Sequence, residues 1–303
     1  MLELLSPAGS PEAVIAAVQN GADAVYLGMG DFNARRGAKN FTNEEFEKAV
    51  TYCRVRGCKV YVTLNTLVND REMGTAVDAA RLASECGADG IIIQDLGLIS
   101  AIRRALPDIP LHASTQMSIH NLAGVQAAAE MGLTRAVLAR ELSLEEIAYI
   151  TKNAPIETEI FVHGTLCFCH SGQCYMSSLI GRRSGNRGMC AQPCRMQYSL
   201  GGRMDDYPMS LKDNCLVDRL REIEEAGVAC IKIEGRMKRP EYTAIVTGIY
   251  SKALREHRQP TPEEMTMLTK AFSRQGFTQG YFNGDRKDMF GVRGEPEEGT
   301  EKI

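Results

Sequence analysis

Five of the ten cysteines in this chain fall in one short stretch, where their spacing could support metal binding. The pattern is Cys167-x6-Cys174-x15-Cys190-x3-Cys194, with Cys169 as an additional thiol. Four thiolates held by a glycine-rich loop can bind either tetrahedral zinc or a 4Fe-4S cluster. Structural zinc usually uses pairs separated by two to four residues, so the wide first pair favours iron–sulfur. Unligated thiols are the remaining alternative.

The other five cysteines lie in segments whose patterns predict helices or strands. Cys53, Cys58, Cys86 and Cys230 are expected to be small core residues. Cys215 stands at the start of a predicted helix and could provide a spare metal ligand.

The sequence shows none of the signals that direct a protein out of the cell or into a membrane. Its N-terminus, MLELLSPAGS, has no basic segment followed by an apolar one, and no run of about 18 apolar residues occurs. We therefore expect a cytoplasmic protein that does not bind membranes. Because cytosolic thiols stay reduced, a cysteine cluster there indicates metal binding or catalysis rather than disulfides.

Arginines accompany the cysteine cluster. No acidic residue occurs between positions 164 and 204, and Lys238 and Arg239 could extend the basic set. A solvated loop is the simplest interpretation, but unopposed arginines beside a cluster also suit the binding of RNA phosphates. The net charge of −3 and the pI near 6.0 exclude a uniformly basic protein but not a local patch. The arginines are Arg182, Arg183, Arg187, Arg195 and Arg203.

Short apolar runs alternate along the chain with amphipathic stretches, which is the pattern of strands followed by helices. This order makes neighbouring strands parallel, and eight such units predict a closed, TIM-like (β/α)8 barrel of the α/β class. An open doubly wound sheet is the alternative. The predicted strands are residues 2–6, 24–28, 59–65, 90–95, 111–116, 135–140, 158–163 and 230–235. The predicted helices are residues 11–21, 43–57, 71–87, 96–106, 121–132, 143–153, 214–227 and 240–257.

Two segments do not fit the repeating unit. We assign residues 1–257 to the barrel, but the interval 164–213 is too long for an ordinary connection and predicts an iron–sulfur insertion after the seventh strand. Residues 258–303 are polar and glycine-rich, which predicts a C-terminal extension that is mobile or that begins a further domain.

Alternation along the predicted strands separates side chains that face the helices from those that face the barrel interior. The helix-facing set is apolar, whereas the interior set includes the charged residues Glu159 and Lys232. Burying an unpaired charge costs several kcal/mol. These two residues must therefore pair with each other or with Glu3, or bind a ligand.

Polar residues also stand at the carboxyl ends of the predicted strands, the face on which barrel enzymes carry their sites. Arg140, Lys232 and Arg236 could together bind a small polyanion, because guanidinium groups bind carboxylates through paired hydrogen bonds. His163 is either an acid–base group or a histidine hydrogen-bonded into its strand end. We assign catalytic roles to His163, Glu234, Gln116 and Asn65, and substrate binding to Arg140, Lys232, Arg236, Ser6 and Gln94.

Several long motifs make the sequence recognisable. HGTLCFCHSGQCYMSS, GMCAQPCR and IKIEGRMKRPEY together resemble peptidase family U32. ELLSPAGSPEA, NGADAVYLG, LHASTQMSIHN and VLARELSLEEI look like the same family, and the similarity spans about residues 2–257.

The resemblance implies a particular chemistry. The family was named for collagenase-like peptidase activity, but its better-understood members are similar to hydroxylases of RNA and of the ubiquinone pathway. Those work without molecular oxygen, depend on prephenate and carry a 4Fe-4S cluster on four cysteines, which by motif are here Cys167, Cys174, Cys190 and Cys194. The second cysteine pair and IKIEGRMKRPEY look more like the RNA branch, whose products are 5-hydroxyuridine in transfer RNA and 5-hydroxycytidine in large-subunit ribosomal RNA.

We therefore expect a hydroxylase that binds prephenate, a small dicarboxylate, at the cationic strand ends and takes RNA on the arginine loop. Two alternatives remain open. A peptidase would need an unusual nucleophile such as Cys169 with His163 or His170, because no HExxH or recognisable Ser/His/Asp pattern occurs. The chain could also be a non-catalytic iron–sulfur scaffold that works with a homologous partner subunit.

Overall fold

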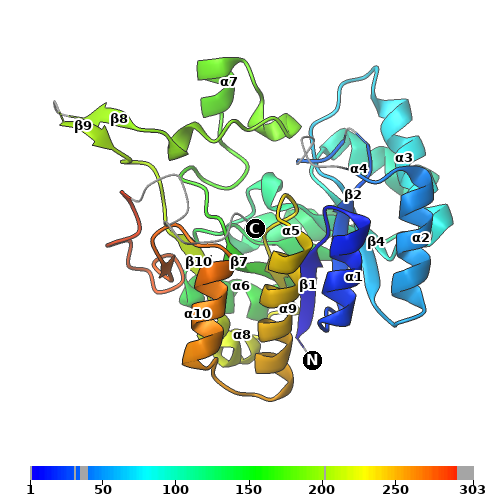
Figure 1. Ribbon diagram of the computed structural model, residues 1–303. Helices are drawn as coiled ribbons and strands as arrows, with labels where there is room; N and C mark the ends of the chain where they lie inside the picture. Colours follow the sequence, from blue (N-terminus) through cyan, green and yellow to red (C-terminus); the bar gives the residue numbers. More distant parts are fainter. Residues whose placement is uncertain (1, 31, 35–39, 201–202, 292–303) are drawn as a thin grey trace.

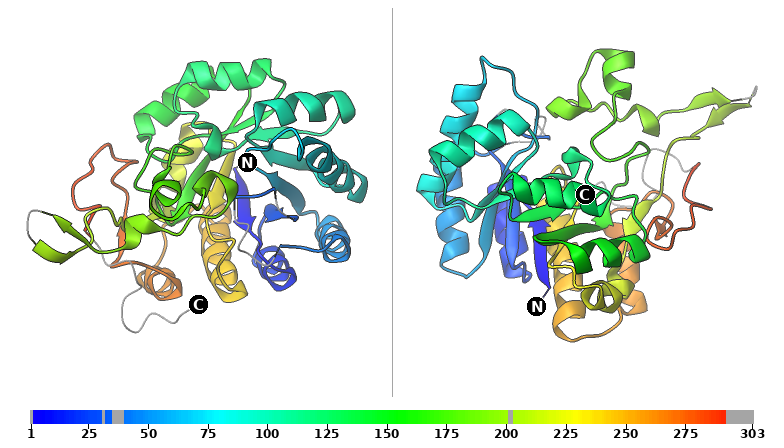
Figure 2. Two further views of the ribbon diagram at one scale, coloured as in Figure 1. Left: turned by 90° about the horizontal axis from the view of Figure 1, so that it is seen from above. Right: turned by 180° about the vertical axis from the view of Figure 1, so that it is seen from behind.

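The computed structural model describes residues 2–30, 32–34, 40–200 and 203–291. Eight parallel strands form a closed barrel, because β11 pairs with both β1 and β7. Helices surround the strands when the barrel is seen from above (Figure 2). The barrel strands are β1 (Glu3–Pro7), β2 (Ala24–Gly28), β3 (Lys59–Leu64), β4 (Gly90–Ile93), β5 (Leu111–Ala113), β6 (Arg135–Val137), β7 (Glu157–Gly164) and β11 (Cys230–Ile233).

The connecting helices begin where the sequence provides caps. Ser10, Asp95 and Asn121 each accept a hydrogen bond from the backbone of the first helical turn, and Thr42 and Ser143 form full capping boxes. The helices are α1 (Pro11–Gln19), α2 (Asn43–Arg54), α3 (Met73–Cys86), α4 (Leu96–Ala105), α5 (Leu122–Glu130), α6 (Leu144–Asn153), α8 (Leu220–Glu225) and α9 (Pro240–Arg255). Among the described helices, none is long and apolar enough to cross a bilayer.

The predicted barrel is confirmed, and all eight predicted strands are present within a few residues of their expected bounds. The prediction of a helix over 214–227 is wrong at its start. Residues Asp213–Cys215 form β10, which pairs antiparallel with the end of β7, and α8 begins only at Leu220 after a 3-10 turn. Tertiary pairing with β7 overrides the local pattern.

The segment after residue 258 contributes structure of its own. Helix α10 (Pro262–Ala271) packs against α9, and β12 (Phe277–Thr278) pairs with β10. The buried Arg274 side chain bonds to Asp213 at 2.8 Å and joins this segment to β10. Residues 258–291 are therefore attached to the barrel, while 292–303 lie outside the described residues.

The insertion after β7 stands over the carboxyl ends of the barrel strands (Figures 1 and 2). It contains α7 (Met176–Gly181), two 3-10 turns, η2 (Gly185–Arg187) and η3 (Pro193–Arg195), and the hairpin of β8 (Tyr198–Leu200) and β9 (Arg203–Asp206). The hairpin projects away from the barrel axis (Figure 1). This insertion thus covers the face that carries the active site in barrel enzymes.

An ion-pair network fills the interior near the amino ends of the strands. Arg135 binds Glu3 at 2.7 Å and Glu159 at 3.5 Å, while Lys232 binds Glu159 at 3.0 Å. Glu3 also binds Lys59 at 2.8 Å. The 3.0 Å contact confirms the expectation that Glu159 and Lys232 pair within the core. Pairing avoids the cost of burying a charge without a partner.

Replacing Arg135 with methionine leaves Glu3 and Glu159 buried without their shared cation. We expect the free energy of unfolding to fall by about 3–5 kcal/mol in urea titrations. Lys48→Met is the matched control, because its ion pair with Glu44 is exposed and screened by solvent and should contribute little to stability. Equal effects of the two substitutions would contradict a supporting role for the network.

Candidate functional site at the barrel mouth

A small cavity of about 80 Å³ lies at the carboxyl ends of the strands, beneath the insertion. The barrel provides its floor and walls, and the insertion provides Cys167, Ser171 and Gly172 as its cover. A ligand larger than a few water molecules must therefore displace part of that cover. The barrel residues are Tyr26, Ala34, Thr63, Asn65, Ile92, Ser114, Thr115, Gln116, Arg140, Phe161, Lys232, Glu234 and Arg236.

Arg140 connects the barrel to the cysteine segment. Its guanidinium group binds the carboxylate of Glu234 at 2.7 Å and lies 3.9 Å from the centre of the Phe161 ring. A second guanidinium nitrogen lies 3.6 Å from the sulfur of Cys167, and the Arg140 amide bonds to the Ser171 hydroxyl at 3.2 Å. One side chain thus contacts an acid, an aromatic ring and a predicted metal ligand.

Lys232 and Arg236 add two further cations to the same cavity. The Lys232 ammonium lies 4.3 Å from the centre of the Tyr26 ring, and Arg236 donates to the Thr63 hydroxyl at 2.7 Å. A side chain at Gly28 would collide with the Arg236 guanidinium, so glycine is required there. The three cations that the sequence grouped as an anion receptor therefore line one cavity.

Amide side chains occupy the opposite wall. Asn65 accepts a hydrogen bond from the Ala34 amide at 2.9 Å and donates to Ser114 at 3.2 Å. The Gln94 side chain donates to the backbone carbonyl of Asn65 at 2.8 Å, so Gln94 positions Asn65. Gln116 lines the cavity from the turn after β5 rather than from the strand.

Ser6 and His163 do not reach the mouth, contrary to their assignment. Ser6 faces outward, and its hydroxyl lies 2.6 Å from that of Thr247 on α9. The register of β7 against β11 shifts between Phe161 and His163, and this irregularity turns His163 toward α9, where it packs against Tyr250. Strict alternation fails at such an irregularity.

The surroundings of His163 keep its imidazole neutral. The ring is fully buried among Tyr242, Tyr250 and Phe277, and burial lowers the pKa of His163 to about 3. Cys215 lies in the same region, 3.8 Å from the Tyr250 hydroxyl, and is buried in the core. The prediction that Cys215 is a spare metal ligand therefore finds no support in its position.

Sequence alternation could have found further mouth residues. Tyr26 lies two residues from both Ala24 and Gly28, so all three positions face the same side of their strand. Thr63 likewise faces the same side as Tyr61. Ser171 and Gly172 also line the cavity, but no sequence periodicity predicts this, because the path of the insertion sets their positions. Gly172 has a φ of +78° and packs on the Gln116 carbonyl, where any side chain would collide.

The predicted arginine set divides into exposed and structural members. Arg182 and Arg183 are exposed after α7, whereas Arg187 binds both carboxylate oxygens of Glu72 at 2.6 and 2.8 Å. Arg187 therefore ties the insertion to the loop before α3. The side chain of Arg203 lies outside the described residues.

Arg195 is unsuited to the RNA contact predicted for it. It is buried and donates to the Leu166 carbonyl at 2.6 Å, to the Ser210 hydroxyl at 3.0 Å and to the Leu211 carbonyl. Its donors hold the base of the insertion together. Repeated arginines in a loop predict both roles equally, so the sequence could not separate it from Arg182.

Lys238 and Arg239, which could extend the basic set, carry less positive charge than expected. Lys238 is partly buried over the Phe272 ring, and burial together with nearby Arg274 lowers the pKa of Lys238 to about 7. Its charge is therefore incomplete at neutral pH. Arg239 remains exposed.

The four predicted ligand cysteines share one region of the insertion. Burial raises the pKa of Cys194, and the neighbouring Cys167, Cys190 and Cys174 raise it further. The Ser177 hydroxyl lies 3.8 Å from the Cys190 sulfur. Among the described residues, no three cysteine, histidine or acidic side chains converge as metal ligands.

Cys169 does not resemble an activated nucleophile. Its thiol donates to the Gln173 carbonyl at 3.4 Å, and burial and nearby Cys174 raise its pKa. His163 is enclosed on the α9 side of the barrel, and His170 lies 3.3 Å from Glu141. A thiol protease needs the opposite, a lowered thiol pKa and an adjacent base.

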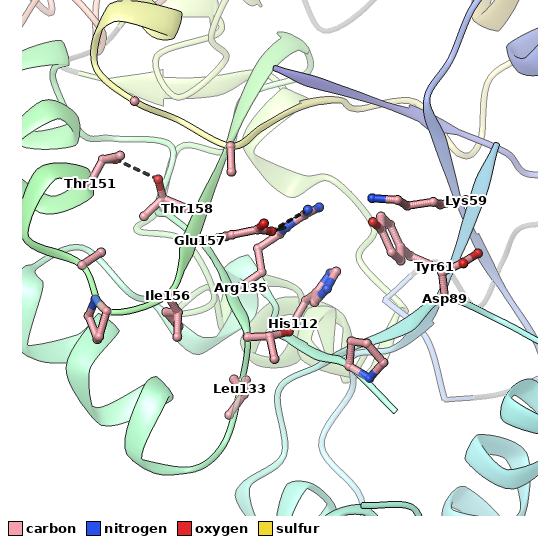
Figure 3. A pocket seen from close by; sticks show the side chains of 16 residues that line it. Lys59, Tyr61, Asp89, His112, Leu133, Arg135, Thr151, Ile156, Glu157 and Thr158 are labelled. Carbon is pink, nitrogen blue, oxygen red and sulfur yellow. Dashed lines mark hydrogen bonds and ion pairs between the residues drawn. The ribbon is translucent and has the colours of Figure 1, made fainter. Parts of the chain in front are cut away.

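A larger cavity of about 770 Å³ opens at the amino ends of the strands (Figure 3). Lys59, His112 and Arg135 point into it, but the two cations already have partners: Lys59 binds Glu3, and Arg135 binds Glu157 at 2.7 Å. Burial lowers the pKa of His112 to about 3 and keeps it neutral. We assign this end to stability, as is usual for barrels.

Comparison with known proteins gives a consistent result. Residues 9–289 match the model of Peptidase family U32. The chain is 38% identical over 264 residues to tRNA hydroxylation protein P1 of Bacillus subtilis (strain 168), covering 83% of this chain and 63% of that protein. It is also 38% identical over 287 residues to 23S rRNA 5-hydroxycytidine C2501 synthase of Escherichia coli (strain K12), covering 93% of this chain and 42% of that protein. The chain thus spans less than two thirds of either relative.

A solved structure supports the fold. The U32 peptidase Mk0906 superposes with a TM-score of 0.51 at 14% sequence identity, covering 78% of this chain and 94% of that chain. At this identity, the likeness concerns the arrangement of strands and helices alone.

The buried His163 predicts a specific response to acid. Because its folded pKa lies below the ordinary 6.5, the unfolded chain binds a proton that the folded chain does not. The contribution of neutral His163 to the free energy of unfolding is fully present above pH 6.5. As the pH falls from 6.5 toward 3, this contribution decreases by about 1.4 kcal/mol per pH unit. His163→Phe should remove that slope in urea titrations between pH 6 and 4, whereas the control His257→Gln, at an exposed position, should retain it. An unchanged slope in His163→Phe would refute the assignment.

Proposed function

The chain belongs to peptidase family U32, and from that premise we propose that it hydroxylates a pyrimidine base in RNA at the barrel mouth. The observation that carries the proposal is the 38% identity to two proteins named for hydroxylation of transfer RNA and ribosomal RNA. The mouth geometry supports it, because three cations and two amides converge on one cavity. The proposed substrate is transfer RNA or large-subunit ribosomal RNA. A homologous partner subunit is also part of the proposal.

We propose prephenate as the co-substrate. Converting a ring C–H to C–OH is a two-electron oxidation, so the reaction needs an oxygen source and an acceptor for two electrons. Prephenate would serve as both if its hydroxyl group exchanges with the ring hydrogen, which leaves prephenate reduced by two electrons. Prephenate is a dicarboxylate, and Arg140, Lys232 and Arg236 offer two guanidinium groups and an ammonium to its carboxylates. Arg140 would exchange its 2.7 Å bond to Glu234 for one to the ligand.

The cover of the cavity explains how water is excluded. The mouth cavity of about 80 Å³ is too small for prephenate, so the insertion must move outward for binding and then close around a larger, ligand-filled space. Arg187 with Glu72, and Gln173 with Ser118 at 2.8 Å, are the contacts that hold the closed position. Closure then strengthens every charge interaction within the cavity.

A 4Fe-4S cluster on Cys167, Cys174, Cys190 and Cys194 is the proposed cofactor. The donor set has the chemistry of a cluster site, because the four thiols belong to one insertion and Cys167, Cys174 and Cys190 lie near enough to Cys194 to raise its pKa. A bound metal reverses that effect by stabilising thiolates. When bound, such a cluster would supply electron transfer or Lewis acidity. Arg140, near the Cys167 sulfur, would then connect the cofactor to the substrate carboxylate.

Loss of the gene should remove a hydroxypyrimidine from cellular RNA. We expect nucleoside mass spectrometry to show less 5-hydroxyuridine in transfer RNA or less 5-hydroxycytidine in large-subunit ribosomal RNA. Complementation with Arg140→Met should fail because the anion receptor is incomplete, whereas Arg104→Met, at an exposed position on α4, should restore the product. Unchanged levels in both RNA classes would overturn the proposed function.

Iron content tests the cofactor separately. Anaerobically purified protein should be brown with about four irons per chain. Serine at any of the four ligand cysteines should lower the iron content, whereas Cys169→Ser should retain it. Colourless protein that holds a single zinc would refute the cluster.

A further inference from the structure

Helix α7 exposes more apolar surface than its role in the insertion requires. Leu179 is 84% exposed, Ile180 63% and Tyr175 56%. Only Ser177 is buried on this helix, and its hydroxyl accepts from the Ala191 amide at 3.0 Å. One small polar residue is therefore the only fully buried member of the helix, while Tyr175, Leu179 and Ile180 face solvent.

These side chains form a compact surface. Tyr175 and Leu179 are four residues apart and share a face of the helix, and Ile180 follows directly. Arg182 and Arg183 come immediately after the helix and are exposed. We name Tyr175, Leu179, Ile180, Arg182 and Arg183 the α7 surface.

The charge of the surroundings selects the occupant. No acidic residue occurs between positions 164 and 204, and among the described residues neither Arg182 nor Arg183 forms an ion pair, although Arg183 donates to the Met189 carbonyl at 3.2 Å. A polyanion with flat apolar groups satisfies both features: its phosphates pair with arginines, and its bases stack on aromatic and aliphatic side chains. RNA has this chemistry.

The position of α7 suggests what the contact does. The helix stands over the carboxyl ends of the barrel strands, and Ser177 joins it to Cys190 in the cluster segment (Figures 1 and 2). A base inside a stacked strand cannot reach a narrow cavity until it leaves the stack. Exposed aliphatic side chains inserted between bases are a known means of unstacking them.

We propose that the α7 surface is a wedge that unstacks RNA next to the target pyrimidine. Leu179 and Ile180 enter the base step, Tyr175 stacks on a flanking base, and Arg182 and Arg183 bind the adjacent phosphates. The inference rests on the proposed function, since it identifies how the same mouth receives its RNA substrate.

The test uses the full chain and a stem–loop RNA with one uridine or cytidine in its loop and 2-aminopurine as the 3′ neighbour. Unstacking increases 2-aminopurine fluorescence, so wild-type protein should raise it on binding. The double variant Leu179→Ser/Ile180→Ser should lose that increase and bind about tenfold more weakly, a loss comparable to one base stack. The matched control is Val55→Ser, at an exposed apolar position after α2.

Salt dependence tests the arginines separately. Arg182→Ala/Arg183→Ala should reduce the slope of log affinity against log salt by about two, one for each lost phosphate contact. Light scattering should give the same mass for wild type and all variants. A mass that falls in Leu179→Ser/Ile180→Ser would show that the surface binds a second copy of the chain, which overturns the proposal.

The remaining outcomes separate the wedge from the reaction. If wild type leaves 2-aminopurine stacked, or if Leu179→Ser/Ile180→Ser behaves like wild type, the wedge is wrong even when RNA is hydroxylated in cells. If wild type unstacks the RNA through α7 but hydroxypyrimidine levels do not depend on the gene, the wedge stands and the proposed reaction is wrong.

Discussion

The cost of burying charge determines which end of this barrel can bind a ligand. Arg135, Glu3, Glu159 and Lys232 satisfy one another near the amino ends of the strands, and their mutual pairing occupies that half of the interior. The carboxyl ends carry a second set of cations whose partners lie at the cavity surface, where a ligand can exchange with them. Lys232 belongs to both sets, because its ammonium binds Glu159 and its side chain also lines the mouth.

The insertion adds what the barrel cannot supply by itself. A (β/α)8 barrel presents its strand ends to solvent, whereas a reaction on a reactive co-substrate benefits from a closed cavity. Here, buried Arg195 holds the base of the insertion, and Arg187 fastens its outer part to Glu72 on the barrel. The thiols, the cavity cover and the exposed α7 are therefore parts of one segment that these two arginines fasten to the barrel.

Local patterns predicted the fold well because strand alternation and helix capping are local in origin. All eight strands and the inward direction of Tyr61, Phe161 and Lys232 follow from the two-residue period. His163 departs from it because the register of β7 shifts against β11, and that shift arises from pairing between residues about 70 positions apart. The buried role of Arg195 was also hidden, since its partners are carbonyl groups that only the folded insertion brings together.

We propose that RNA reacts at the mouth beneath the insertion. Photocrosslinking tests it most directly, with 4-thiouridine at the target position of a substrate RNA and mass spectrometry of the crosslinked peptides. RNA bound at the mouth should crosslink to residues at the strand ends, within 114–117 and 232–236. Crosslinks to the amino-end cavity, within 133–135 or 155–158, would contradict it.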